Sequence, residues 1–397
     1  MKALLVATTF PRWPRDPGPA PFIFQLAKHL SARMPLTALA PHFPGAARRE
    51  NLEGVDVRRF QYLWPEGLET LADGQGLQNH WRQSFRAKLE AAPFLLAEFL
   101  ALQRLIRAGE YQAVNAHWLA PSGALAACLK KFYRFRLVLT VHAADLFLLL
   151  RVPLGKMLLT WIVGQAEAVF CVSEAIRQGL AEVTGPSEKF RVLPMGADLA
   201  RFSPAGDKAA LRERLRWGPG FLILLVGKLT EKKGATYLLQ ALARLPAQAK
   251  SIRLVIVGEG VLRAELQAEV ERLGLRERVR LVGAKPQEEL ADYYRAADLV
   301  VLPSVRDRLG ETEGMPVVIL EAIASGAPVI ATDVCSAPSA LKGRGLVEVP
   351  SADVGALAEA IAAPLRQSPS VDPAAVRAFA WPEIARQYAE ALTGKGP

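Results

Sequence analysis

The sequence predicts an α/β protein with two doubly wound domains, each a mostly parallel sheet covered by helices on both faces. Two patterns lead to this prediction. Short apolar runs alternate with stretches of helical periodicity in the first half of the chain, and the second half repeats the alternation. The length of 397 residues is enough for two domains of ordinary size that each bury a core.

The first half contains six apolar runs that have the length of buried strands. The predicted strands are residues 3–8, 36–40, 55–60, 113–116, 137–141 and 169–172. Helices are predicted between several of them, for example at residues 22–33 and 123–132. Because strand, helix and strand follow one another repeatedly, we expect this half to form one domain, residues 1–200.

The second predicted domain, residues 201–375, begins where periodicity is lost after residue 195. Its predicted strands are residues 222–226, 253–257, 279–282, 299–302, 329–331 and 346–349, and its predicted helices are residues 234–244, 261–273, 287–296 and 353–365. A further helix, residues 381–392, lies in a tail of residues 376–397. Ligands of such sheets bind at the carboxyl ends of the strands, so we expect the domains to face a central ligand-binding cleft.

The composition excludes several classes of protein. Hydrophobic residues make up 51% of the chain and charged residues 22%, which excludes global disorder. No run of about 18 uncharged apolar residues occurs, so no transmembrane helix is predicted. The most apolar region, residues 146–170, is interrupted by charges and a proline and could only dip into a bilayer. Three widely separated cysteines indicate a reducing, cytoplasmic location and no metal site.

The net charge of +10 lies mostly in the first 200 residues, which hold 23 Lys and Arg against 16 Asp and Glu. Two segments there, residues 81–89 and 130–136, mix aromatic with basic side chains. Such mixtures suit an anionic membrane surface, where rings lie at headgroup level and cations attract phosphate. The alternative is an amphipathic core helix with a solvated face. Nucleic acid is not an expected partner, because no recognised binding motif accompanies the charge.

Two carboxylates flank the start of a helix in the second half. Pro316 marks this start, because the first helical turn does not need the N–H that proline lacks. Glu313 precedes it beside Gly314, where a ligand can approach the backbone, and Glu321 lies inside the helix. The helix start around Gly314, Met315 and Pro316 favours an anion or a group of hydroxyls. Taken alone, the two glutamates could instead be a helix cap and a solvated side chain.

From Glu313 the sequence reads E-G-M-P-V-V-I-L-E-A-I-A-S-G-A-P-V-I-A-T-D. This stretch resembles the E-x7-E signature of the retaining glycosyltransferases of family 4, which have the GT-B fold. The resemblance implies that Glu313 contacts the donor sugar and that Glu321 contacts the ribose hydroxyls. It also implies that the tail helix crosses back onto the first domain.

A second motif, G-K-L-T-E-K-K-G, starts at Gly227 after a predicted strand. Cations on such a loop can neutralise a diphosphate, although a solvated Lys-rich turn is the alternative. The loop is similar to the family's V-G-R-L-x-x-x-K-G motif, which implies that Lys228 and Lys233 grip the donor diphosphate. Lys228 stands in place of an arginine and loses bidentate geometry. By the same resemblance, Gly258 in V-G-E-G is a candidate neighbour of the nucleotide.

In the first half, T-V-H-A-A-D places His142 at the carboxyl end of a strand. A lone histidine at this place could be an ordinary core residue. The stretch resembles the family's T-x-H-G-x-D, which implies that His142 lies close to the transferred sugar and that Asp145 belongs to the acceptor side. Gly18, in the loop after the first strand, and His117, in an H-x-x-x-P-x-G stretch, are further acceptor-side candidates by resemblance.

The resemblance extends over nearly the whole chain and implies a retaining, metal-independent glycosyltransferase of the hexosyltransferase type. Such an enzyme moves a sugar from a nucleotide-diphosphate sugar to a hydroxyl of a surface glycan or lipid-linked saccharide. A UDP- or GDP-sugar is the expected co-substrate, no cofactor is expected, and no D-x-D motif occurs. We expect a cytoplasmic protein that contacts the inner face of the cell membrane peripherally.

Two other functions stay open. A glycoside hydrolase would use Glu313 and Glu321 as acid and base, without a nucleotide. A GT-B protein that has lost its transferase chemistry would bind membranes without needing Glu313 or Lys233.

Overall fold

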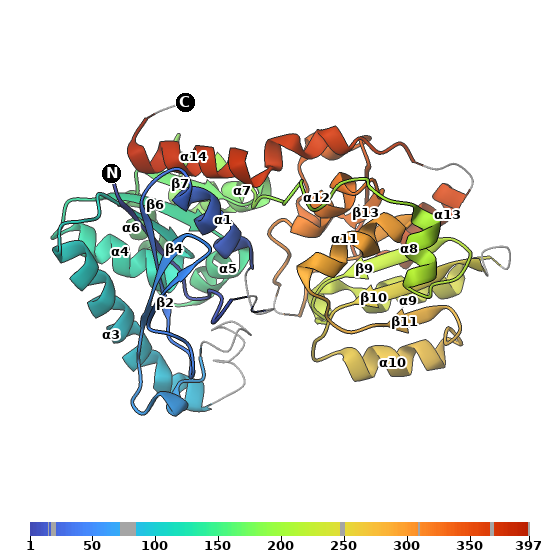
Figure 1. Cartoon of the computed structure of the whole chain (residues 1–397), viewed down its shortest axis with the longest axis horizontal. Helices are drawn as coiled ribbons and strands as arrows, with labels where there is room; N and C mark the ends of the chain where they lie inside the picture. Colours follow the sequence, from blue (N-terminus) through green and yellow to red (C-terminus); the bar gives the residue numbers. More distant parts are fainter. Residues whose placement is uncertain are drawn as a thin grey trace. The chain divides into compact units, whose positions relative to one another are not determined.

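The computed structural model describes residues 1–14, 16, 21–71, 85–246, 251–308, 310–365 and 369–395. It divides into two compact units, Met1–Met195 with Trp381–Pro397, and Gly196–Ala380 (Figure 1). The sequence places the domain boundaries after residues 200 and 375 instead. The difference arises because the segment after Met195 is held by the second unit: Ala197 N–H donates to Phe379 O at 2.9 Å, and Phe202 is buried in that core.

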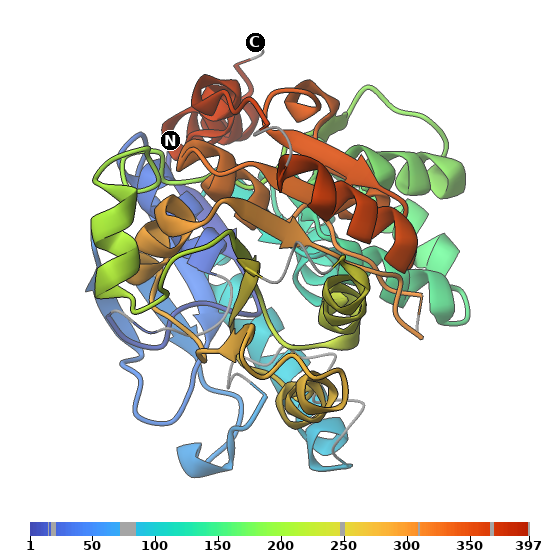
Figure 2. The same ribbon diagram turned by 90° about the vertical axis from the view of Figure 1, so that its right-hand side faces the viewer.

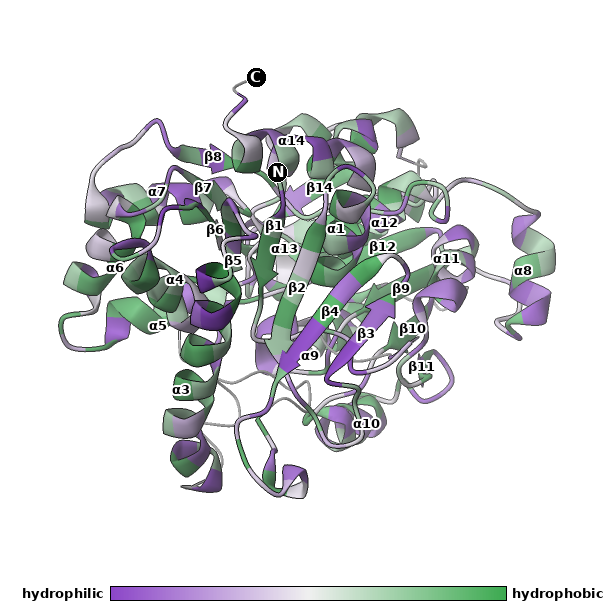
Figure 3. Cartoon of the chain, turned by 60° about the vertical axis from the view of Figure 1, so that its left-hand side comes forward, coloured by the Kyte–Doolittle hydropathy of each residue, from purple (hydrophilic) through white to green (hydrophobic). Residues whose placement is uncertain are grey.

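The first unit contains an eight-stranded sheet in the order β3-β4-β2-β1-β5-β6-β7-β8. The strands are β1 (Ala3–Val6), β2 (Leu36–Pro41), β3 (Arg49–Leu52), β4 (Val55–Phe60), β5 (Ala113–His117), β6 (Arg136–Val141), β7 (Ala168–Cys171) and β8 (Phe190–Val192). All neighbours are parallel except β3 and β4. Neither β3 nor β8 is predicted, because both edge strands carry exposed polar residues, as the hydrophilic colour of β3 in Figure 3 shows.

Helices flank this sheet. They are α1 (Pro21–Ser31), α3 (Phe85–Arg107), α4 (Ala124–Lys130), α5 (Ala143–Arg151), α6 (Gly155–Gly164), α7 (Glu174–Thr184) and α14 (Trp381–Thr393), with short turns at η1 (Glu66–Leu68) and η2 (Leu119–Gly123). The tail helix α14 packs against α1, β5 and β6. Its buried Tyr388 hydroxyl lies 3.0 Å from the hydroxyl of Thr140 on β6. The last helix is therefore part of the first unit's core.

The second unit contains a fully parallel six-stranded sheet in the order β11-β10-β9-β12-β13-β14 (Figure 2). The strands are β9 (Leu222–Val226), β10 (Arg253–Val257), β11 (Val279–Leu281), β12 (Leu299–Leu302), β13 (Val329–Thr332) and β14 (Leu346–Val349). The main helices are α8 (Lys208–Arg214), α9 (Ala235–Arg244), α10 (Arg263–Arg272), α11 (Gln287–Ala296), α12 (Val317–Ala324) and α13 (Val354–Ala362). Every predicted strand is present, with ends that differ by at most two residues.

The strands of the second unit are apolar throughout because both faces of the sheet are covered. Successive residues of β9 alternate between two hydrophobic clusters: Leu222 and Leu224 pack with α11 and α12, whereas Ile223 and Leu225 pack with α9, α10 and α13. This is the pattern of a parallel sheet between two helical layers. Among the described residues, no helix is both long enough and apolar enough to cross a membrane.

Each sheet has a switch point, which is the strand from which the chain first adds strands on one side of the sheet and then on the other. In the first unit β1 lies between β2 and β5, and in the second unit β9 lies between β10 and β12. The loops that follow two such neighbouring strands diverge and leave a crevice at their carboxyl ends, which is where open α/β sheets bind ligands. These two switch points are therefore the expected positions of a ligand-binding site.

Candidate active site

The loops that follow β9 and β12 are packed against each other at the second unit's switch point. Gly234 has φ +65°, and a Cβ on it would lie 1.8 Å from the carbonyl oxygen of Pro303. The N–H of Val305 also donates to Lys232 O at 2.9 Å. Only glycine permits such close backbone contact at a left-handed position, so Gly234 sets the distance between the two loops.

This packing brings Lys233 and Glu313 together, although 80 residues separate them in sequence. Lys233 Nζ lies 2.9 Å from Glu313 Oε2, and the side chains are only 17% and 11% exposed. The other oxygen of Glu313, Oε1, is buried and has no hydrogen-bond partner within the described part of the chain. A half-satisfied buried carboxylate is costly in free energy, and a ligand hydroxyl would satisfy it.

The charge state of Glu313 follows from its surroundings. Burial raises the pKa of the carboxyl, but the charges of Lys233 and Lys232 and the hydrogen bond from Lys233 outweigh burial, so the pKa lies below the ordinary value. The carboxylate is therefore ionised at neutral pH. The side chain of Lys233 lies over Gly227, because a Cβ on this glycine would be 3.3 Å from Lys233 Cε. Lys228, in the same loop, is exposed.

The glycine of the V-G-E-G stretch contacts the neighbouring loop. Gly258 has φ +151°, and a Cβ there would lie 1.8 Å from Gly227 O. A Cβ on Gly260 would likewise lie 2.4 Å from Leu229 O. These glycines thus fix the loop after β9 from one side while Gly234 fixes it from the other.

Helix α12 begins one residue later than predicted. Pro316, with φ −66° and ψ 120°, precedes the helix, and Val317 is its first residue. Met315 and Pro316 are buried, and Gly314 is half-buried beside Glu313. The predicted donor-site residues Gly314, Met315 and Pro316 therefore form the link between the Lys233–Glu313 pair and the start of α12.

Glu321 is buried rather than solvated, with 6% of its surface exposed. The hydroxyl of Tyr294 donates to its Oε2 at 2.8 Å, and the amide of Gln287 donates to Oε1 at 3.5 Å. Burial raises the pKa of Glu321, and the two hydrogen bonds oppose this only in part. The alternative of a solvated Glu321 is wrong. Its two partners on α11 are absent from the sequence prediction, which identifies this helix but not which face meets α12.

In the first unit, the buried His117 pairs with the half-buried His142. His117 ends β5 and His142 precedes α5, and Nδ1 of His117 lies 3.2 Å from Nε2 of His142. Burial lowers the pKa of His142 to about 3, and burial with the nearby His142 lowers that of His117 well below its ordinary value. Both rings are therefore neutral at pH 7. His142 therefore has a partner within the unit, and its place near the transferred sugar stays a prediction.

The turn after His117 is held by two buried carboxyls. Trp118 has φ +68°, a left-handed conformation that costs free energy for any residue with a side chain. Asp145 Oδ2 accepts from Leu119 N–H at 2.8 Å, and Glu98 accepts from the Ser122 hydroxyl at 2.6 Å. Burial raises the pKa of each carboxyl to about 7.

Glu98 is absent from the sequence prediction. A single carboxylate within the apolar part of α3 is the signal that could have found it, because such a residue is rarely buried without a partner. Gly18 lies outside the described residues. In the described ranges, no group of three or more His, Cys, Asp or Glu side chains is placed to hold a metal ion.

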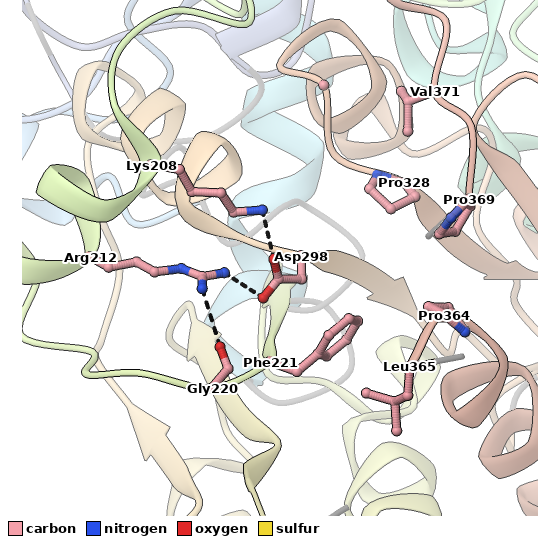
Figure 4. Close-up of a pocket in the computed structure, with 11 residues that line it drawn as sticks. Lys208, Arg212, Gly220, Phe221, Asp298, Pro328, Pro364, Leu365, Pro369 and Val371 are labelled. Carbon is pink, nitrogen blue, oxygen red and sulfur yellow. Dashed lines mark hydrogen bonds and ion pairs between the residues drawn. The ribbon is translucent and has the colours of Figure 1, made fainter. Parts of the chain in front are cut away.

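A separate pocket of about 510 Å³ opens at the opposite edge of the second unit's sheet, where β9, β12 and β13 begin (Figure 4). Asp298, at its centre, lies 2.7 Å from Lys208 and is also paired with Arg212. Phe221, Pro328 and Pro364 form apolar walls. Because the predicted site residues follow the other ends of the strands, this pocket is distinct from the candidate active site.

Two family models match the chain. The model of the glycosyl transferases group 1 matches residues 207–375, and the model of glycosyltransferase family 4 matches residues 18–201. The two matches fall in the second and first units respectively and together cover most of the chain.

Relatives of known function support the same assignment. The GDP-mannose-dependent alpha-(1-6)-phosphatidylinositol monomannoside mannosyltransferase of Mycolicibacterium smegmatis is 29% identical over 286 residues, 70% of this chain and 75% of that protein. The amylovoran biosynthesis glycosyltransferase AmsK of Erwinia amylovora is 32% identical over 223 residues, 56% of this chain and 53% of that protein. This chain thus spans only about half the length of AmsK.

Solved structures show the fold. The Anabaena protein HepE, solved in complex with UDP, has a TM-score of 0.72 at 22% identity and covers 99% of this chain and 100% of its own. Sucrose-phosphate synthase of Thermosynechococcus elongatus has a TM-score of 0.71 at 22% identity, covering 99% and 95%. With two matched family models and the GT-B fold, the chain belongs to the family 4 glycosyltransferases and is a glycosyltransferase.

Proposed function

We propose that this glycosyltransferase is retaining and metal-independent, and that it transfers a sugar from a nucleotide-diphosphate sugar to a hydroxyl of a surface glycan or lipid-linked saccharide. The second unit would bind the donor and the first unit the acceptor. The relatives named above act on phosphatidylinositol mannosides and in amylovoran synthesis, which supports an acceptor of this class. No cofactor besides the donor co-substrate is required by this proposal.

The buried Lys233–Glu313 pair is the observation that carries the proposal. A donor diphosphate that entered the second unit's switch point would meet an ammonium that is already largely removed from water, so their attraction would be strong. The unpartnered oxygen of Glu313 would accept a hydrogen bond from a donor-sugar hydroxyl. The pair is thus suited to hold the sugar and its diphosphate side by side.

The proposed reaction needs charge stabilisation more than a strong base. The bond from C1 of the sugar to the diphosphate oxygen breaks, and its electron pair remains on the leaving phosphate. The acceptor oxygen forms the new bond to C1 on the same face, and the hydroxyl proton passes to the leaving phosphate. Lys233, with Lys228, stabilises the charge that develops on the diphosphate, an effect worth roughly 3–4 kcal/mol for one well-placed donor.

The remaining site residues orient the two substrates in this proposal. Glu321 would accept hydrogen bonds from the ribose hydroxyls, with Tyr294 holding the carboxyl in place. His142 is neutral, so it would hydrogen-bond a sugar hydroxyl without adding a positive charge near the reacting carbon. Asp145 and Glu98 hold the turn after His117 and would act on the acceptor only through it.

A panel of nucleotides tests donor binding. UDP, GDP, ADP and their glucose and mannose conjugates would be compared by thermal shift, and we expect one base to raise Tm. At a concentration of 100 times Kd the stabilisation should be about 2.7 kcal/mol. If none of these nucleotides stabilised the protein, the proposal would be overturned.

The stereochemical and metal-related parts need their own measurements. NMR of the product should show the anomeric configuration of the donor, and an inverted product would contradict the retaining part. Transfer should continue after dialysis against EDTA, and its loss with recovery on adding Mg²⁺ or Mn²⁺ would contradict metal independence.

One observation favours a second candidate, a glycoside hydrolase. The pKa of Glu321 is raised and that of Glu313 is lowered, which is the pairing of a general acid with an ionised carboxylate. A hydrolase would release sugars without any nucleotide and would not need Lys233. Nucleotide-independent turnover that survives Lys233→Ala would favour it over the transferase.

We further propose that the protein works at the cytoplasmic face of the cell membrane. Of the two segments that suggest this, residues 81–84 lie outside the described residues. In the other, Phe132 is 76% exposed beside Lys131, so this ring is not on the buried face of an amphipathic core helix.

A further inference from the structure

Helices α5 and α6 form a hairpin that exposes large apolar side chains. Leu154 is 73% exposed and Met157 65%, and Val152 and Leu158 are also exposed. Met157, Leu158 and the half-buried Trp161 are spaced as i, i+1 and i+4 and share one face of α6, and Leu154 immediately precedes this helix. Both helices are coloured mostly as hydrophobic in Figure 3. The opposite face of α6, with Leu159, Ile162 and Val163, is already buried in the protein.

The backbone at the tip of this hairpin is closely packed and strained. Leu154 has φ +61°, a left-handed conformation that suits Asn or Gly far better than leucine. A Cβ on Gly155 would lie 1.7 Å from Leu149 O, so the end of α5 and the start of α6 are in direct backbone contact. The most exposed leucine of the hairpin is therefore fixed in an unfavourable conformation, and folding of the unit gains nothing from its side chain. Such a combination points to a function outside the fold.

The charges on the hairpin itself have one sign. No Asp or Glu occurs between Leu146 and Ala166, whereas Arg151 and Lys156 are exposed on either side of the tip. Lys131 Nζ lies 5.4 Å from the centre of the Trp161 ring, which adds a third cation at the far end of the apolar row. A group of apolar side chains with cations beside it complements a lipid bilayer that has an apolar interior and anionic headgroups.

We propose that the α5–α6 hairpin inserts Leu154 and Met157 into the headgroup region of an anionic lipid bilayer, while Arg151, Lys156 and Lys131 contact lipid phosphates. A membrane fits better than a protein groove as the occupant, because the hairpin is a protruding tip with flanking cations. Each cation near such a surface adds about 1 kcal/mol of attraction, and the two apolar side chains add the free energy of leaving water.

The hairpin also connects the membrane to the acceptor side of the site. His142 immediately precedes α5, and the tip of the hairpin follows the last residue of α5. The nine residues of this helix therefore separate His142 from the tip by about 13 Å. This inference rests on the proposed function and deepens it: the acceptor would be a saccharide still attached to a lipid, held with its hydroxyl beyond the headgroups.

Vesicle sedimentation tests the proposal directly. Wild-type protein would be mixed with vesicles of phosphatidylcholine alone or of phosphatidylcholine with phosphatidylglycerol, and we expect binding to the anionic vesicles. Leu154→Asn combined with Met157→Gln should weaken this binding at least tenfold. Asn suits both a left-handed φ and the residue before a helix, so Tm should not fall and misfolding cannot explain the loss. Lys156→Glu should weaken binding to anionic vesicles specifically.

The matched control is Val261→Ser, which removes an apolar side chain of equal exposure, 77%, from the second unit and should leave vesicle binding unchanged. The proposal would be overturned if the wild type did not bind anionic vesicles, or if the Leu154/Met157 variant bound as well as the wild type. It would also be overturned if the variant instead abolished a concentration-dependent dimer in ultracentrifugation. The Leu154/Met157 variant should show the same nucleotide thermal shifts as the wild type. A loss of donor binding can therefore be distinguished from a loss of membrane binding.

Discussion

The two units have the same kind of parallel sheet, yet their switch points have opposite electrostatic character. In the second unit the half-buried carboxylate of Glu313 is ionised, because the charges of Lys233 and Lys232 hold its pKa below the ordinary value. In the first unit His117 and His142 are neutral, and the pKa of Asp145 beside them is raised to about 7. The comparison teaches that the sheet supplies only the position of a site, while the side chains of the loops decide whether that site suits a charged or an uncharged group.

Removing the buried cation of the second unit should have the largest effect. Lys233→Ala removes the charge that faces the leaving diphosphate, so we expect kcat/KM for sugar transfer to fall by about 10²–10³-fold. Lys233→Arg should retain part of the activity because the charge remains. Lys232→Ala is the matched control: this neighbour acts on Glu313 only through its charge, and less than about tenfold should be lost. Initial rates at varied donor concentration provide the check, and a Lys233→Ala enzyme within threefold of the wild type would contradict the assignment.

The second prediction concerns pH and the first unit. Glu98 has a pKa of about 7 in the folded protein and an ordinary value near 4.5 when unfolded. Between these values the folded state holds the proton that the unfolded state releases, so stability falls as pH rises from about 4.5 to about 7. The difference is at most about 3 kcal/mol. Glu98→Gln keeps a partner for Ser122 without a titrating group, so Tm should depend less on pH in this range.

Glu313 makes the opposite contribution, which sharpens the comparison of the two units. Its pKa is lowered in the folded state, so its stabilisation is present above the ordinary pKa and is lost as pH falls through the folded value. Thermal unfolding from pH 4 to 8 would separate the two slopes. Glu110→Gln, at a fully exposed position, is the control that should keep the wild-type slope between pH 5 and 7. An unchanged slope in Glu98→Gln would show that Glu98 does not titrate in this range.

The third prediction concerns the support of Glu321. Tyr294→Phe removes the hydroxyl that donates to Glu321 Oε2, leaving a buried carboxyl with one weak partner, and should cost about 1–3 kcal/mol of stability. If Glu321 holds the ribose, KM for the donor should rise while kcat changes little, because such binding is equal in ground and transition states. Tyr293→Phe is the control on the same helix, since it removes a hydroxyl that contacts Lys285 rather than Glu321 and keeps the ring contact with Trp217. A lower kcat with unchanged KM would assign Tyr294 and Glu321 to the chemical step instead.

Much of this organisation can be predicted from the sequence because it follows from short-range patterns. Strands buried on both faces are apolar at every position, and glycine or proline marks their ends, so β9 and β12 are recognised with their correct bounds. The ion pair of Lys233 with Glu313 is not predicted, although both residues lie in loops that follow β9 and β12, which are neighbouring strands of a doubly wound sheet.

The residues that support the site are harder to predict. Tyr294, Gln287 and Glu98 act across the interface between one element and the next, and sequence periodicity shows that a helix has a buried face without showing what that face meets. The edge strand β3 is missed for a related reason: its exposed side chains have no alternation to detect.

The smallest expected effect is at Lys228, the exposed counterpart of Lys233. An exposed cation is screened by solvent, so its attraction for a diphosphate is far weaker than that of the buried lysine. Lys228→Arg provides a planar group that can bind two phosphate oxygens at once, and we expect donor affinity to rise by about two- to fivefold. Titration of the donor nucleotide by calorimetry is the measurement, with Lys285→Arg, another lysine of the second unit, as the control that should change nothing. If Lys228→Arg left affinity unchanged while Lys233→Ala abolished it, the diphosphate would be held by the buried pair alone, and the exposed end of the loop would have no part in donor binding.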